Sequence, residues 1–197
     1  DDSEFAAGGT IYRLIEQGKD VHLIVLSNPA KSLPEGFPQD TLINEQLSSA
    51  EMLGIKRENI QFFDFPVREF SQCRQEILEV LVDVAKKLEP DVVFCSATND
   101  IHQDHYQSGL EAMRAFRKKT VCFYDVPWNT NKSELNLNIQ LSSDHISAKI
   151  RAIKCYESQA HRPYSEVDYI EGWAKTRGIY SNYSYAESFE LVTMSID

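Results

Sequence analysis

VVFCSATNDIHQDH, the stretch Val92–His105, decides the fold class of this sequence. Its first four residues, Val92–Cys95, form an apolar run that predicts a buried strand, and the residues from Tyr106 to Phe116 have the pattern of a helix. In open α/β sheets, ligands and catalytic groups gather just beyond the carboxyl ends of strands. The polar half of this stretch lies at such a position, so it indicates an α/β fold with a site at the end of this strand.

The polar half contains two histidines, His102 and His105, with Asp104 between them. This spacing supplies two imidazoles and a carboxylate within about one helical turn. Such a set can bind a divalent metal through one imidazole while the carboxylate tunes the other. The alternative is that both histidines are surface loop residues and that Asp104 is an N-cap, with Gln107 completing a capping box. A pattern this short leaves both interpretations open.

Composition favours one enzyme-sized domain over residues 1–197. The chain has 197 residues, of which 42% are hydrophobic, and no apolar run approaches the ~18 residues of a membrane helix. A net charge of −10 argues against nucleic acid and anionic lipid as partners. The cysteines show no CxxC spacing, so we expect reduced thiols in a cytoplasmic protein and no cysteine-based zinc site. These cysteines are Cys73, Cys95, Cys122 and Cys155.

Segments with strand character alternate with helical segments along the chain. This alternation predicts a three-layer α/β sandwich with a mostly parallel sheet. The predicted helices are 4–17, 41–53, 73–88, 106–116 and 149–159, and the predicted strands are 21–26, 60–65, 92–96, 121–124 and 189–194. We expect substrate specificity to reside in the loops 27–40, 66–70 and 129–138.

Four patterns in the order found here carry a family resemblance. The chain begins with Asp1-Asp2-Ser3-Glu4 and a GGT helix, and the HxDH pattern follows. KIRAIKCYESQ (Lys149–Gln159) and YAESF (Tyr185–Phe189) come later. Together they resemble the LmbE-like (PIG-L) family of metal-dependent N-deacetylases over nearly the whole chain. The resemblance implies a Rossmann-like fold, and it places the family's first strand upstream of residue 1.

The resemblance also implies roles for particular residues. The metal, Zn²⁺ or another divalent ion, would be held by Asp2, His105 and a histidine two residues before Asp1. Asp1 would be the general base, and His102 would stabilise the tetrahedral oxyanion. Asp104 would orient His102 and favour its protonated form. We expect Asp2 and His105 to approach closely enough to share the metal, because both follow strands of a doubly wound sheet.

The substrate is predicted only as a class. Arg68 can clamp an anionic or carbonyl group, although a surface salt bridge is the alternative. Trp128 can stack on a sugar ring or fill the core, and Arg162 is a third candidate substrate contact. We expect a zinc-dependent N-deacetylase acting on an N-acetylated sugar or sugar-containing small molecule. The alternatives are a metal amidase or esterase for another acyl group and a non-catalytic homologue that binds glycans or proteins; homo-oligomerisation is left open.

Overall fold

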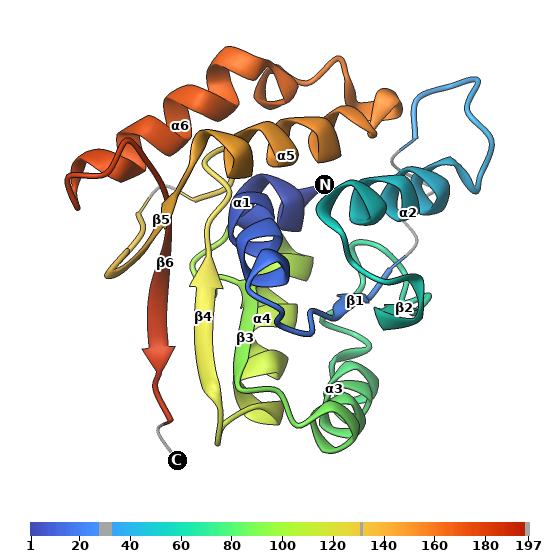
Figure 1. Cartoon of the computed structure of the whole chain (residues 1–197). Coiled ribbons are helices and arrows are strands. Elements are labelled where there is room, and N and C mark those ends of the chain that lie inside the picture. The colour runs from blue at the N-terminus through green and yellow to red at the C-terminus, as the bar shows by residue number, and fades with distance from the viewer. Residues whose placement is uncertain (28–32, 131, 196–197) are drawn as a thin grey trace. The chain divides into compact units, whose positions relative to one another are not determined.

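The computed structural model describes residues 1–27, 33–130 and 132–195, and the chain forms two compact units (Figure 1). Unit 1 comprises Asp1–Asp64 and Asn138–Glu187, and unit 2 comprises Phe65–Leu137 and Ser188–Asp197. Both units combine helices with strands, which confirms a mixed α/β fold.

Unit 1 is built on α1, which packs against α2 and α5 (Figure 1). Its short strands β1 and β2 are parallel, with Leu23 opposite Ile60. Gly54 ends α2 in the left-handed conformation (φ 85°), which a residue without a Cβ adopts freely. The elements are α1 Asp2–Glu16, β1 Leu23–Val25, α2 Thr41–Leu53, η2 Arg57–Asn59, β2 Ile60–Phe62, α5 Ser143–Lys154, η3 Glu157–Gln159, η4 Pro163–Ser165 and α6 Val167–Ile179.

A buried ion pair fixes the middle of α1. Nζ of Lys149 lies 2.7 Å from Oε1 of Glu187, and both side chains are buried. The same carboxylate accepts hydrogen bonds from the backbone N–H groups of Gly9 (3.0 Å) and Thr10 (2.7 Å). A Cβ at Gly8 would lie 3.1 Å from the Lys149 side chain, so glycine permits this approach. The lysine helix and the YAE motif therefore meet on α1.

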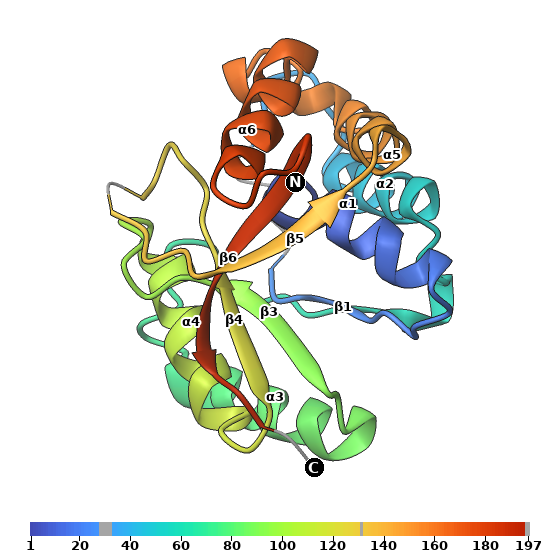
Figure 2. The same cartoon turned by 60° about the vertical axis from the view of Figure 1, so that its left-hand side comes forward.

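Unit 2 places two parallel strands against a helical layer. In β3 and β4, Val92 pairs with Thr120 and Ser96 with Tyr124. Figure 2 shows these strands side by side, and α4 packs on β3 and on α3. The elements are α3 Arg74–Leu88, β3 Val92–Ser96, α4 Gln103–Ala115, β4 Thr120–Tyr124 and the later part of β6 Tyr185–Thr193. The strand predicted at 92–96 is confirmed, but only Ser96 at its end is buried and Val92 is exposed, so the expectation of a buried strand is corrected.

The sheet containing β3 is mixed, which corrects the expectation of a mostly parallel sheet. Its order is β3-β4-β6-β5. β6 is antiparallel to β4, with Cys122 opposite Leu191 and Phe123 opposite Glu190. β5 (Leu137–Leu141) was not predicted, because its LNIQL sequence follows an asparagine-rich segment that is typical of a loop.

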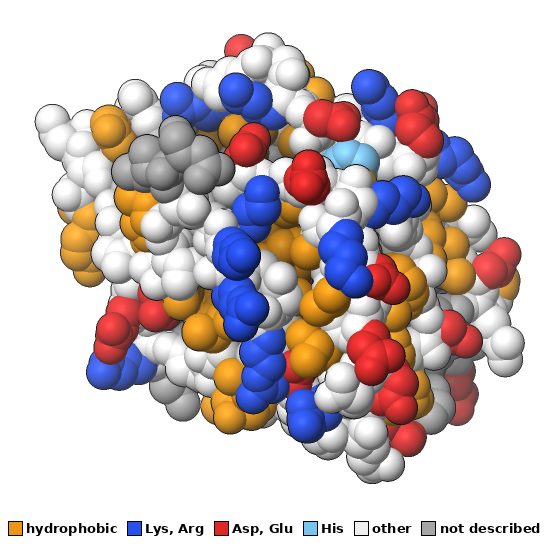
Figure 3. All heavy atoms as spheres, turned by 90° about the horizontal axis from the view of Figure 1, so that it is seen from below, with side chains coloured by type: hydrophobic (Ala, Val, Ile, Leu, Met, Phe, Trp, Pro, Cys, Tyr) orange, Lys and Arg blue, Asp and Glu red, His pale blue; other side chains and the backbone are white. Residues whose placement is uncertain are grey.

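The surface is not uniformly acidic. Figure 3 shows a face on which Lys and Arg side chains gather beside acidic and hydrophobic ones. The net charge of −10 therefore does not describe every face of the protein. Among the residues that the structure describes, no helix combines the length and apolar character needed to cross a membrane.

Candidate active site

His102 caps the helix that carries the second histidine. The segment 97–102 connects β3 to α4, and His102 is the N-cap residue of α4. Its Nδ1 accepts a hydrogen bond from the backbone N–H of Asp104 at 3.2 Å. The alternative in which Asp104 is the N-cap is therefore wrong, because the capping acceptor is an imidazole nitrogen.

His105 is held by a carboxylate to which the sequence analysis gave no role. Its Nδ1 lies 2.8 Å from Oδ2 of Asp100, which is only 6% exposed. Because an ionised carboxylate can only accept, Nδ1 of His105 is the donor, and in the neutral ring Nε2 then keeps its lone pair. A histidine whose Nδ1 is bonded to a carboxylate in this way is the usual form of a metal ligand.

The position of Asp100 in the sequence predicts part of its role. Its Oδ1 accepts a hydrogen bond from the backbone N–H of His102 at 2.7 Å, two residues further along the chain. Aspartate commonly bonds the backbone two residues on, which stabilises a turn. An aspartate two residues before the first histidine of HxDH therefore predicts such a turn.

The two histidines have opposite partners on Nδ1. A backbone N–H can only donate, so Nδ1 of His102 accepts, and the proton of the neutral ring lies on Nε2. Because Nδ1 is used as an acceptor, Nε2–H is the donor that this ring offers. The rings lie close together, with centroids 4.6 Å apart. The pair thus supplies one Nε2 lone pair, on His105, and one Nε2–H donor, on His102.

Asp104 makes contacts different from the expected ones. Its carboxylate accepts hydrogen bonds from the backbone N–H groups of Arg68 (2.6 Å) and Phe70 (3.2 Å). Its link to His102 runs through its backbone N–H. Arg68 is exposed and has a φ of 70°, in the left-handed region. The structure therefore brings Arg68 and the HxDH segment together in unit 2.

Trp128 belongs to the same part of unit 2. It follows β4, and 36% of its surface is exposed, so it does not fill the core. The backbone N–H of Ile101 donates to the carbonyl of the neighbouring Asn129 at 3.2 Å. This bond ties the Trp128 segment to the segment that contains both histidines.

Asp1 and Asp2 lie in unit 1, at the start of α1. The hydroxyl of Tyr164 donates a hydrogen bond to Oδ2 of Asp1 at 2.8 Å. Burial and the charge of Asp2 raise the pKa of Tyr164 to about 12, so this hydroxyl stays protonated at neutral pH. Arg162 is exposed and lies two residues before Tyr164. Sequence reasoning missed Tyr164, because nothing in the local sequence pairs it with Asp1.

The first turn of α1 also rests on a buried carboxylate. Oε1 of Glu4 accepts hydrogen bonds from Nε2 of Gln46 (2.6 Å) and from the hydroxyl of Tyr156 (3.1 Å). Glu4 is 1% exposed. The fourth residue of the Asp-Asp-x-Glu pattern therefore anchors the turn that carries the two aspartates.

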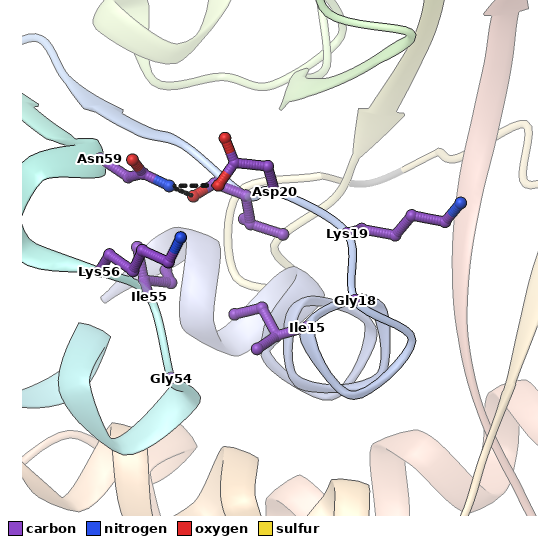
Figure 4. A pocket seen from close by; sticks show the side chains of 9 residues that line it. Ile15, Gly18, Lys19, Asp20, Gly54, Ile55, Lys56 and Asn59 are labelled. Atoms are coloured by element: carbon purple, nitrogen blue, oxygen red, sulfur yellow. Dashed lines mark hydrogen bonds between the residues drawn. The ribbon is translucent and has the colours of Figure 1, made fainter.

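A hollow in unit 1 lies away from these groups. It has a volume of about 320 Å³, and in it Nδ2 of Asn59 donates to Oδ1 of Asp20 at 2.8 Å (Figure 4). It opens before the amino ends of β1 and β2, whereas catalytic groups gather at carboxyl ends. Its lining residues are Ile15, Gly18, Lys19, Asp20, Val21, Gly54, Ile55, Lys56 and Asn59.

The donors suit zinc, although the described residues of neither unit provide a complete ligand set. Within the described part of either unit, no group of three or more His, Cys, Asp or Glu side chains is placed to hold a metal ion. Imidazole nitrogen and carboxylate oxygen are both usual zinc ligands. Asp2 belongs to unit 1 and His105 to unit 2, so their sharing of one ion stays a prediction.

Comparison with known proteins identifies relatives. A diacetylchitobiose deacetylase of Thermococcus kodakarensis is 27% identical over 98% of this chain and 79% of its own length. The solved structure of TT1542, a conserved protein of Thermus thermophilus, matches with a TM-score of 0.84 at 20% identity, covering 100% of this chain and 92% of that one. N,N'-diacetylchitobiose deacetylase of Pyrococcus horikoshii matches with a TM-score of 0.82 at 19% identity, covering 97% and 79%.

These structural likenesses show a shared fold. The family model described as "PIG-L: GlcNAc-PI de-N-acetylase" matches residues 1–116, more than half of the chain. This protein therefore belongs to the PIG-L (LmbE-like) family.

Proposed function

We propose that this protein is a zinc-dependent deacetylase that removes the acetyl group from an N-acetylated sugar or sugar-containing small molecule. The observation that carries the proposal is the pair of opposite hydrogen bonds on Nδ1 of His102 and His105. They give neighbouring imidazoles the two functions that amide hydrolysis needs, a metal ligand and an oxyanion donor. The de-N-acetylase description of the family supports the same reaction.

Zinc fits the donors that the chain offers. His105 presents the lone pair of Nε2, and Asp2 at the start of α1 offers a carboxylate. When bound, Zn²⁺ supplies Lewis acidity that activates water at neutral pH and polarises the acyl oxygen. Asp100 keeps the His105 ring in the orientation and tautomer that this role requires.

The remaining residues handle the proton and the developing charge. Asp1 accepts the proton of the attacking water and returns it to the leaving amine, which needs an acid to depart. Tyr164 holds the Asp1 carboxylate through its hydroxyl. His102 donates its Nε2–H to the oxygen that becomes negative in the tetrahedral intermediate.

The substrate contacts are proposed to come from loops. Arg68 binds an oxygen acceptor of the substrate, Trp128 stacks on a sugar face, and Arg162 adds a third polar contact. Two of the predicted specificity loops, 27–40 and 129–138, include residues 28–32 and 131, which lie outside the described residues.

Amine release from a panel of N-acyl substrates tests the proposal. The zinc-loaded protein is incubated with N-acetylglucosamine, N,N'-diacetylchitobiose, N-butyryl analogues and an acetate ester. We expect equal amounts of acetate and free amine from the N-acetyl sugars, and less product from the others. A preference for the butyryl or ester substrates would favour the amidase or esterase alternative. Saturable sugar binding without turnover would establish a binding protein.

Removal of the Tyr164 hydroxyl tests the hydrogen bond to the proposed base. We expect Tyr164→Phe to lower kcat roughly tenfold, because a hydrogen bond to a charged acceptor contributes about 1.5–3 kcal/mol. KM and zinc content should stay near wild type, since Asp2 is untouched. The measurement is steady-state kinetics with metal analysis of the same samples.

Tyr180→Phe is the matched control for this variant. Tyr180 is 81% exposed, so loss of its hydroxyl should change neither rate nor metal content. An unchanged kcat in Tyr164→Phe would show that the Tyr164 hydroxyl does not assist the proposed base, Asp1. Zinc loss together with the rate would mean that Tyr164 maintains the metal-binding turn.

A further inference from the structure

The carboxylate of Asp104 accepts hydrogen bonds from the backbone of a loop. Its oxygens accept from the backbone N–H groups of Arg68 at 2.6 Å and Phe70 at 3.2 Å, and its side chain is buried. Hydrogen bonds to an ionised acceptor are stronger than neutral ones, and more so away from water. Asp104 therefore restrains the backbone of the loop Pro66–Phe70.

The loop holds one residue in an unfavourable backbone conformation. Arg68 has a φ of 70°, which residues with a Cβ rarely adopt. The backbone N–H of Glu69 donates to the carbonyl of Pro66 at 3.1 Å, and the buried Phe70 ring packs edge-on against Phe65. Such a conformation persists where its surroundings restrain it, and it is concentrated at ligand-binding positions.

The consequence is a cation on a fixed backbone. The Arg68 side chain is exposed, while the backbone on both sides of it is bonded or packed. A guanidinium presented in a fixed direction binds an oxygen acceptor with less loss of freedom than one on a mobile loop. Asp104 lies in the first turn of α4, between the two histidines, so it links Arg68 to the catalytic segment.

We propose that Asp104 is a positioning residue for Arg68, and that its carboxylate serves substrate binding through the loop Pro66–Phe70. The Arg68 guanidinium then sets specificity by binding an oxygen acceptor of the substrate beside the N-acetyl group. This inference rests on the proposed function for the identity of the substrate. The restraint on the loop is a property of unit 2 alone and is tested without any substrate.

A double-mutant cycle tests the part of the proposal that concerns substrate binding. We expect Asp104→Asn to raise KM about tenfold and to leave kcat within about twofold, because binding is lost while the histidines keep their contacts. Arg68→Ala should raise KM by a similar factor. In the Arg68→Ala background, Asp104→Asn should have little further effect, since both changes remove one function.

Two outcomes of this cycle would overturn the proposed role of Asp104 in substrate binding. If Asp104 acts on His102, Asp104→Asn lowers kcat in both backgrounds. If Asp104 and Arg68 act independently, the effects of the two substitutions on KM multiply. Asp144→Asn is the matched control, because it removes an exposed first-turn aspartate from α5 and touches no loop of unit 2.

Limited proteolysis tests the loop half independently of activity. Trypsin cleaves after Arg68, and we expect Asp104→Asn to increase the rate of this cleavage at least about fivefold as local opening becomes easier. Cleavage after the exposed Arg117 should not change, which controls for global unfolding. Equal cleavage after Arg68 in wild type and variant would overturn the proposal even if the enzyme is an active deacetylase.

Arg68→Gly gives a second measure if Asp104→Asn unfolds. Glycine adopts a φ of 70° without strain, so we expect Arg68→Gly to raise the thermal midpoint. A lower midpoint would contradict the strained turn. Absence of turnover in wild type would instead end the proposed function and leave these two measurements valid.

Discussion

We expect replacement of His105 with alanine to remove bound zinc and the proposed deacetylase activity together. The imidazole supplies the proposed nitrogen ligand, and a site with three protein ligands cannot lose one and keep its metal. The contact of Nδ1 with Asp100 leaves Nε2 available for the proposed role. We expect less than about a tenth of the wild-type zinc content after gel filtration, and a rate at least about 10³-fold lower.

His161→Ala is the control for loss of an imidazole. His161 is exposed, so this variant should keep full zinc content and activity. Asp100→Asn is the graded companion, because loss of the carboxylate behind a ligating histidine typically weakens metal affinity about 10–100-fold. A His105→Ala protein that retains stoichiometric zinc would exclude His105 as a ligand and would end the metal assignment.

The second large effect is expected from Asp1→Ala. Loss of the general base should lower kcat by about 10²–10⁴, because water is then deprotonated without a positioned acceptor. Zinc content should remain near that of wild type, since Asp1 is assigned to the proton and Asp2 to the metal. Single-turnover amine release and metal analysis of the same preparation separate these two quantities.

Asp2→Ala provides the contrast. Asp2→Ala should lose zinc and activity together, as is expected for His105→Ala. Asp1→Ala should lower only the reaction rate and keep its zinc. If Asp1→Ala loses zinc as fully as Asp2→Ala, the roles of the two aspartates are reversed. Full activity in Asp1→Ala would require another base.

Local patterns were sufficient to predict the elements with clear boundaries. The helix 41–53 has the predicted limits because Gly54 ends it, and the strand 92–96 begins with four consecutive apolar residues. The direction of β6 was not predictable, because alternation along a strand is the same whether its partner runs parallel or antiparallel. β5 was missed because its polar residues match those of the loop before it.

In the candidate site, too, local features were predictable from the sequence and long-range contacts were not. The HxDH segment and its position after β3 were visible in the sequence, and the turn at Asp100 is a local feature that a closer interpretation can predict. The contacts of Asp1 with Tyr164 and of Asp104 with Arg68 join residues far apart in the chain. No local pattern encodes them, since they depend on tertiary packing.

The contact between Glu187 and α1 joins residues that are synthesised at very different times. The oxygen that accepts from the N–H of Gly9 belongs to Glu187, which is synthesised 178 residues later. Long-range contacts of this kind form late, because the chain between them must first be made and then closed. A nascent chain that has not reached Glu187 also leaves the Lys149 ammonium without its carboxylate. The hydrogen bonds between α1 and Glu187 therefore form only after most of unit 1 has been synthesised.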